Sequence, residues 1–123
     1  MKPITPSTRK LANIHTADYQ HWQNEDGSEL TDQGFLQLDD SFPPGSGFYI
    51  YKMDPGAVST PHEHTCRENF LILEGELIDN DGYVYRKGDL VMLDEGTQHS
   101  STAPNGCLIA VFVRTIESDL TTS

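Results

Sequence analysis

The chain has 123 residues and 36% hydrophobic content, which suits one globular domain with a core of its own. Its formal net charge is −11, from 19 acidic and 8 basic side chains, so direct binding to nucleic acid or to an anionic membrane surface is not expected. With only two cysteines, no apolar run near the roughly 18 residues of a membrane span and no apolar signal core at its start, the sequence predicts a cytoplasmic protein.

The N-terminal segment carries two prolines and little periodicity. We expect residues 1–30 to form an arm and the first edge elements, with the first 14 either loose or laid over a neighbour. Short apolar runs separated by turn residues follow, at 35–38, 47–53, 70–73, 77–78, 83–85, 90–93 and 107–113. The polar segment 117–123 is expected to be a frayed tail.

The spacing of these runs predicts an all-β protein. Short runs about ten residues apart, with turn residues between them and no long helical pattern, are typical of strands. On this pattern a sandwich, a jelly roll and a barrel all remain open. The candidates for side chains that line an interior pocket are Phe48, Tyr49, Ile50, Tyr51, Phe70, Ile72, Met92, Ser101 and Phe112.

Three of the five histidines and one glutamate form a candidate metal site. His62 and His64 are two residues apart, which places both imidazoles on one face of an extended chain. Glu68 follows after a three-residue link, and His99 lies just past a turn further along the chain. Imidazole and carboxylate groups from neighbouring strands can bind one ion, and this mixed set suits Fe, Mn, Ni, Cu or Zn.

Two glycine-framed patterns contain these four residues. The first runs from Gly56 to Gly75 as G-x5-H-x-H-x3-E-x6-G and matches the first cupin motif at every fixed position. The second starts at Gly88 and reaches His99, and it is similar to the second cupin motif, G-x5-P-x-G-x2-H-x3-N. It departs from that motif at two positions that are not metal ligands in the family: Asp94 replaces the usual proline and Ala103 the usual asparagine.

The chain therefore resembles a single-domain cupin. The resemblance implies an RmlC-like jelly-roll barrel, which we place at residues 31–116. It also implies one divalent metal ion held by His62, His64, Glu68 and His99. Fe²⁺ or Zn²⁺ is the favoured ion, with Ni²⁺ or Mn²⁺ as alternatives. Cupins often pair their barrels, so a homodimer is expected.

A narrower resemblance is to the cupin domain of ChrR-type anti-sigma factors, in which the cupin is a C-terminal sensing module. It is carried by the stretch around His62 and Glu68, by Trp22, and by a set of acids and glycines downstream. That set comprises Leu73-Glu74-Gly75-Glu76, Asp79, Asp81-Gly82, Gly88 and Gly106-Cys107. The zinc-binding domain that precedes the cupin in those proteins is not expected here, because the first 30 residues contain no cysteine.

Two functions follow from these resemblances. One is a metal-dependent dioxygenase acting on a chelating, diketone- or enol-like molecule, as in similar stand-alone cupins. The other is a module that binds metal and a small ligand, or senses oxidants, without turnover. A sugar-phosphate isomerase is disfavoured by the few basic residues, and a thiol dioxygenase by the acidic ligand Glu68.

The remaining reactive side chains are interpreted as structural or solvated. Cys66 is expected to be a small loop residue and Cys107 a buried one. The others in this group are His15, His21, Glu63, Asp94 and Glu95.

Overall fold

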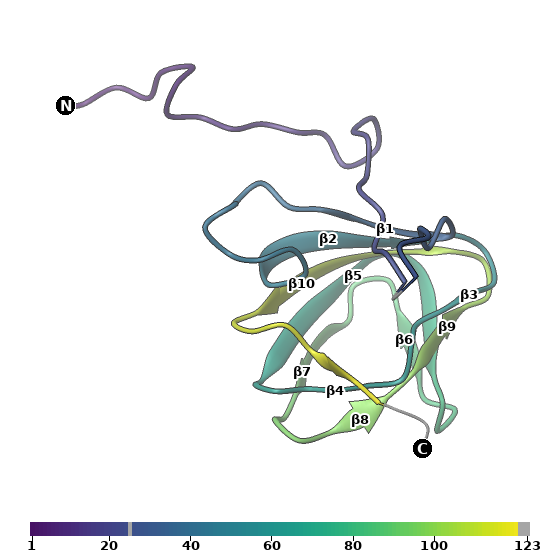
Figure 1. The fold of residues 1–123 in the computed structure, drawn as a ribbon. Coiled ribbons are helices and arrows are strands. Elements are labelled where there is room, and N and C mark those ends of the chain that lie inside the picture. Colours follow the sequence, from purple (N-terminus) through teal and green to yellow (C-terminus); the bar gives the residue numbers. More distant parts are fainter. Residues whose placement is uncertain (25, 121–123) are drawn as a thin grey trace.

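The computed structural model describes residues 1–24 and 26–120, and every regular element in that part of the chain is a β-strand (Figure 1). The prediction of an all-β protein is confirmed. No helix in the described residues is long and apolar enough to cross a membrane. The strands are β1 (Gln33–Leu36), β2 (Gly47–Met53), β3 (Ala57–Val58), β4 (His62–Glu63), β5 (Glu68–Asp79), β6 (Val84–Arg86), β7 (Leu90–Leu93), β8 (Gln98–His99), β9 (Ser101–Ala103), β10 (Cys107–Val113) and β11 (Ser118–Asp119).

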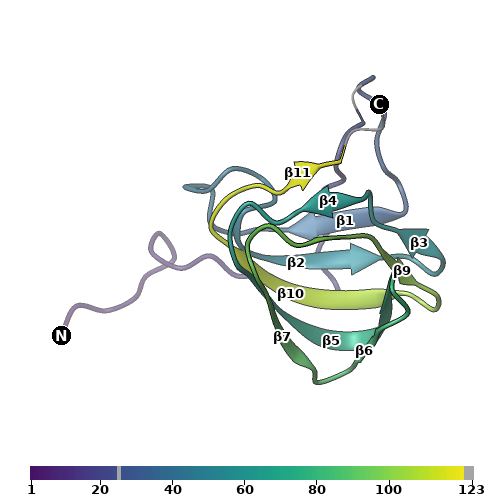
Figure 2. The same ribbon diagram turned by 90° about the horizontal axis from the view of Figure 1, so that it is seen from below.

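Two antiparallel sheets enclose the interior. The larger has the order β1-β2-β10-β5-β9-β3, with β6 and β7 also paired to the long strand β5. The smaller has the order β11-β4-β8. Figures 1 and 2 show the sheets curling round a shared interior. In Figure 1, β4 and β8 lie on the side opposite β1 and β2. The short strands β4 and β8 therefore bring the two histidine segments together at one side of the barrel.

Alternation along β2 and β10 decides which side chains enter the interior. Tyr49, Tyr51 and Met53 point inward from β2, and Ile109 and Val111 do so from β10. The buried core also contains Phe35, Ala57, Phe70, Ile72, Leu77, Tyr85, Ala103, Cys107 and Val113.

Four of the expected pocket residues do not line the interior. Phe48, Met92 and Phe112 are exposed on the outer face, at 59%, 55% and 42%. Ile50 is buried, but the alternation of β2 places it on the face opposite Tyr49. In a run that is apolar at nearly every position, the pattern does not show which alternate side chains face the core, so the sequence did not decide between the two faces.

The two termini contribute more than was expected of them. Gln20 forms a bridge with Phe35, and the Trp22 ring stacks on the Phe35 ring at 4.8 Å between centroids. In place of the expected frayed tail, Ser118–Asp119 form β11 and pair with β4. Residues 121–123 of that tail lie outside the described residues.

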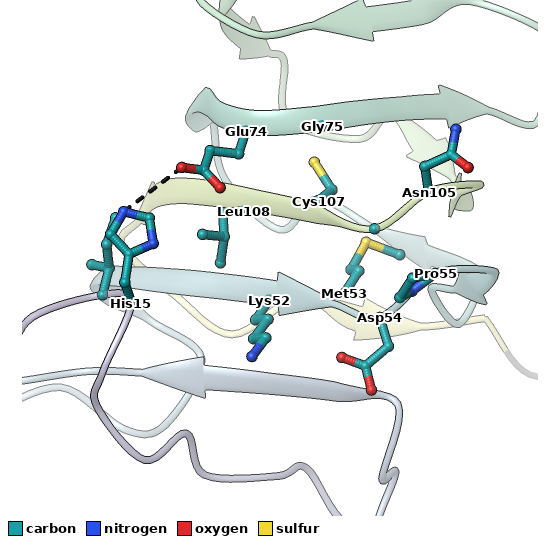
Figure 3. Close-up of a pocket in the computed structure, with 12 residues that line it drawn as sticks. His15, Lys52, Met53, Asp54, Pro55, Glu74, Gly75, Asn105, Cys107 and Leu108 are labelled. Atoms are coloured by element: carbon teal, nitrogen blue, oxygen red, sulfur yellow. Dashed lines mark ion pairs between the residues drawn. The ribbon is translucent and has the colours of Figure 1, made fainter.

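The paired strands β5 and β10 approach each other closely near Gly75. Gly75 has φ 80°, and the pairing of the two strands shifts register between Leu108 and Ile109. A Cβ on Gly75 would lie 2.1 Å from the carbonyl oxygen of Gly106. Figure 3 shows the adjacent outer groove, where His15 lies 3.7 Å from Glu74.

Candidate metal centre

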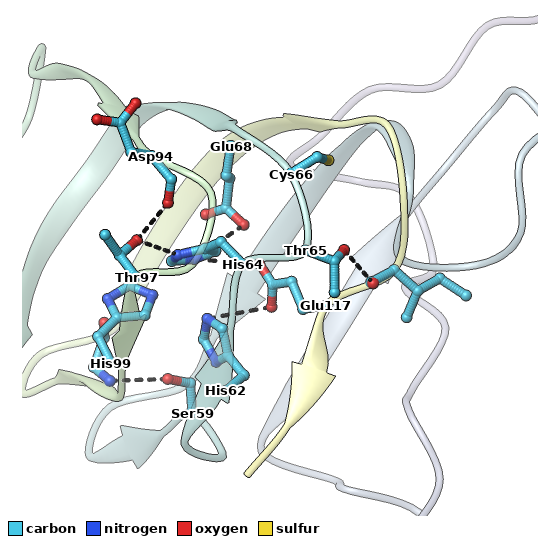
Figure 4. A network of polar contacts seen from close by, with 12 residues as sticks. Ser59, His62, His64, Thr65, Cys66, Glu68, Asp94, Thr97, His99 and Glu117 are labelled. Carbon is cyan, nitrogen blue, oxygen red and sulfur yellow. Dashed lines mark hydrogen bonds and ion pairs between the residues drawn. The ribbon is translucent and has the colours of Figure 1, made fainter.

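The histidines of both motifs gather at the small sheet (Figure 4). His62 in β4 is directly opposite His99 in β8, and His64 follows β4. The three rings lie 4.6 to 5.1 Å apart between centroids. Glu68, the first residue of β5, lies with its Oε2 3.7 Å from His64 Nε2. The structure thus groups the three histidines of the motifs and places Glu68 against one of them, His64.

Each imidazole is oriented by a hydrogen bond at Nδ1. His62 Nδ1 is 2.8 Å from the carbonyl oxygen of Thr60, which can only accept, so this nitrogen carries the proton. Thr97 Oγ1 donates its proton to the carbonyl of Asp94 and therefore accepts from His64 Nδ1 at 2.9 Å. Both contacts leave Nε2 with a free lone pair, which is the form of histidine that binds metal.

The third imidazole is held by a buried carboxylate. His99 Nδ1 lies 3.1 Å from Asp79 Oδ1, and Asp79 also accepts hydrogen bonds from Ser101 and Tyr85 at 2.5 and 2.6 Å. Burial alone would raise the pKa of Asp79, but the hydrogen bonds from these partners hold it below its usual value. Asp79 is therefore an ionised acceptor that fixes the proton of His99 on Nδ1.

Replacing Asp79 by Asn should weaken metal binding about 10- to 100-fold, as expected for an outer partner of a ligating histidine. The single oxygen of an amide cannot accept from all three donors. The amide also favours the present imidazole tautomer of His99 less than a carboxylate does. Titration with Zn²⁺ measures the effect, and the exposed Asp40→Asn is the matched control. Equal affinities for the two variants would show that Asp79 does not orient His99.

Two buried polar atoms at the centre lack a partner within the described residues: His64 Nε2 and Glu68 Oε2. An unpaired buried polar atom is costly, and here two such atoms face each other at 3.7 Å. Burial, and after it the carboxylate of Glu117, raises the pKa of Glu68 well above its usual range. A divalent cation between these atoms would satisfy both, so the donor set fits a metal ion.

A second carboxylate, Glu117, reaches the same point from the segment before β11. Its Oε2 lies 3.2 Å from His62 Nε2 and its Oε1 lies 3.7 Å from His64 Nε2. Two groups of donor atoms can hold a metal ion, one formed by the three histidines and one by His64, Glu68 and Glu117. His64 belongs to both groups, so the cluster is continuous.

An outer cavity of about 310 Å³ leads to this cluster. It is lined by Trp22, Leu30, Tyr49 and Tyr51 among others, and it ends at His62 and Glu117. A smaller void of about 40 Å³ lies behind it, against Glu68 and His99. Tyr51 donates its hydroxyl to Gln33 Oε1, so this phenol is already engaged at the cavity wall.

A family model of the ChrR cupin-like domain matches residues 10–117. The chain belongs to this family. This confirms the narrower resemblance to the cupin domain of ChrR-type anti-sigma factors. No curated protein matches the sequence of this cupin.

Solved structures show the same fold at low identity. An RmlC-like cupin from Ralstonia eutropha superposes with TM-score 0.70 at 14% identity, covering 91% of this cupin and 72% of that chain. The complex of SigE with the anti-sigma factor ChrR from Rhodobacter sphaeroides gives 0.61 at 16%, covering 87% and 51%. An acetylacetone dioxygenase from Acinetobacter johnsonii gives 0.61 at 14%, covering 92% and 78%. The predicted RmlC-like cupin barrel is confirmed.

Three residues of the centre had no role assigned from the sequence of this cupin. Asp79 is among the residues that carry the ChrR resemblance, but nothing marked it as a partner of His99. Thr97 is an ordinary turn residue in the second motif, and Glu117 falls in the expected tail. Their positions depend on contacts between segments far apart in the chain, which no local pattern encodes.

Three other reactive side chains lie away from the imidazoles, as expected. Asp94 pairs through its carboxylate with Arg67 at 3.4 Å and is exposed, and Glu63 accepts a hydrogen bond from Gln98. Cys107 is buried, and burial raises the pKa of its thiol to about 12. None of these side chains orients an imidazole.

Proposed function

We propose that the cupin binds one divalent transition metal through His62, His64, Glu68 and His99. The convergence of free Nε2 atoms carries this proposal, because the protein uses Nδ1 of each ring for its own hydrogen bonds. The buried, unpaired Glu68 Oε2 supports the fourth position. Fe²⁺ or Zn²⁺ suits this nitrogen and oxygen set best, and Ni²⁺ or Mn²⁺ also fits it.

The activity that we propose is oxygenolytic cleavage of a chelating, diketone- or enol-like small molecule. Bound iron would supply activation of O₂ and of the enolate, with both oxygen atoms entering the products and no external reductant needed. The residues of the chain would bind and orient the substrate. The cavity of about 310 Å³ has the size of a small-molecule site and reaches His62. Its aromatic wall, with Trp22, Tyr49 and Tyr51, would exclude water from the substrate.

A sensing module without turnover is the second candidate. It is supported by the family match, since the ChrR cupin-like domain gives the family its name. Glu117 also supports it, because a second carboxylate at the histidines restricts access to the metal. With Zn²⁺, which has no redox chemistry, the centre would act as a binding site or a structural pin.

Oxygen consumption separates the two candidates. We expect the Fe²⁺-loaded protein to consume one O₂ per acetylacetone or related β-diketone cleaved, with no consumption by Zn²⁺-loaded protein. A panel of β-diketones and catechol-like chelators is offered at saturating concentration. Tight Zn²⁺ binding without O₂ uptake by the iron form across this panel would contradict the dioxygenase and leave the sensing module.

We further propose a cytoplasmic homodimer that binds neither nucleic acid nor membranes. The charge of −11 and the two free thiols fit this setting. Phe48 and Phe112 pair across β2 and β10, and Met92 of β7 lies in the same row beyond Asn69 of β5. All three are exposed, which supports pairing of two barrels there. Sedimentation velocity tests the dimer.

A further inference from the structure

Glu117 lies at ligand distance from the histidines although it belongs to neither motif. Metal–nitrogen and metal–oxygen bonds are about 2.1 Å, so two ligands of one ion lie about 3.0 to 3.5 Å apart, depending on the angle between them. Glu117 Oε2 lies 3.2 Å from His62 Nε2, within this range, and Glu117 Oε1 lies 3.7 Å from His64 Nε2, just beyond it. The distance from Glu68 to His64 Nε2, within the family pattern, is also 3.7 Å. By this measure Glu117 is at least as well placed as Glu68.

The contact between Glu117 and His62 fits two ligands of a shared cation. Its length of 3.2 Å lies within the range expected for two ligands of one ion. His62 already carries its proton on Nδ1, bound to the carbonyl of Thr60. The lone pair on Nε2 therefore faces a carboxylate oxygen, and a cation between them removes the repulsion.

Glu117 also borders two spaces at the centre. Like four other residues, among them Tyr49 and His62, it lines both the outer cavity of about 310 Å³ and the inner void of about 40 Å³. The inner void holds about one water molecule and has no room for a diketone. A small molecule in the outer cavity therefore lies beside Glu117 and His62, whereas Glu68 lines the inner void but not the outer cavity.

The segment that carries Glu117 is attached to the barrel by few contacts. The Thr65 hydroxyl bonds to Thr115 and to the carbonyl of Ile116, and Leu120 N donates to the carbonyl of Pro61. Two residues of β11 pair with β4. Ile116 is 52% exposed, so its side chain does not anchor the segment in the core. Such a segment can move without unfolding the barrel.

We propose that Glu117 is a fifth ligand of the resting centre and that a chelating small molecule reaches the metal by replacing its carboxylate. The inference rests on the metal binding proposed above. Three neutral imidazoles and Glu68 leave a divalent ion with a charge of +1, and Glu117 brings it to zero. An anionic, bidentate ligand that replaces Glu117 keeps the centre neutral. It also brings a second oxygen donor to the metal.

Cobalt titration of Glu117→Gln tests the first half of this inference. We expect the variant to bind Co²⁺ at least about 10-fold more weakly than the parent protein, by isothermal titration calorimetry. We also expect a change in the visible d–d absorption of bound Co²⁺, which reports the number and geometry of its ligands. Glu63→Gln removes the same charge from β4 but points away from the histidines, and it should behave like the parent protein.

Titration of the Co²⁺-loaded proteins with acetylacetone tests the second half. Loss of the competing carboxylate should make acetylacetone bind at least about 10-fold more tightly to Glu117→Gln than to the parent protein or to Glu63→Gln. Unchanged acetylacetone affinity would overturn the replacement of Glu117 by the ligand.

The remaining outcomes separate this inference from the proposed function. A Glu117→Gln protein with the cobalt affinity and spectrum of the parent would overturn the fifth ligand and leave the four-residue site in place. A parent protein that binds no Co²⁺ would overturn the proposed metal centre and this inference with it. Thermal melts of the metal-free variants confirm that each is folded.

Discussion

A His64→Ala protein should lose metal binding almost completely, with the dissociation constant for Zn²⁺ rising more than about 100-fold. This loss is larger than the loss expected when a residue that only orients a ligand is replaced. His64 is the residue shared by both groups of donor atoms, so its removal breaks both. It is also 1% exposed, and its Nε2 has no partner among the described residues. Calorimetric titration of chelator-treated protein measures the change.

Two further variants control this experiment. His15→Ala removes an exposed histidine that pairs with Glu74 far from the site, and it should retain the affinity of the parent protein. His99→Ala removes a proposed ligand at the edge of the small sheet, where truncation disturbs packing less. It should lose metal as His64→Ala does. Full metal occupancy in either ligand variant would show that the proposed set is wrong.

Gly75→Ala should lower the free energy of unfolding by about 3 kcal/mol or more. The new Cβ would lie 2.1 Å from the Gly106 carbonyl oxygen. This oxygen belongs to the backbone where β5 and β10 pair closely, so it cannot rotate away as a side chain could. The residue also has φ 80°, which disfavours any side chain. Denaturant unfolding of the metal-free protein measures the loss.

Gly82→Ala is the matched control for the steric part. Gly82 has φ 90° in the turn after β5, but nothing lies within 4 Å of its Cβ position. It should cost only about 1 kcal/mol, the price of the backbone conformation alone. Equal losses for the two variants would mean that the close approach to Gly106 does not constrain the barrel.

The sequence predicted the parts of this molecule that local patterns encode. Glycines at fixed spacing frame His62, His64, Glu68 and His99. The structure groups the three histidines and places Glu68 beside His64. The side chains of β2 that face the core could not be predicted, because Phe48, Tyr49, Ile50 and Tyr51 are all apolar or aromatic. Which alternate residues face inward is decided only when the rest of the barrel covers one face of the strand.

The orienting residues were beyond reach for a different reason. Asp79 approaches His99 across the pairing of β5 with β9, twenty residues away along the chain. Glu117 reaches His62 only because β11 pairs back onto β4. Charged residues in polar segments are normally solvated, so the sequence around Glu117 carried no signal of a buried contact.

The metal content of the wild-type protein tests the central claim most directly. The protein is purified without chelator, reconstituted separately with Fe²⁺, Zn²⁺, Mn²⁺ and Ni²⁺, freed of loose metal and analysed by inductively coupled plasma mass spectrometry. We predict one equivalent of at least one of these ions per chain. Occupancy well below one equivalent with all four ions would contradict a metal centre at His62, His64, Glu68 and His99.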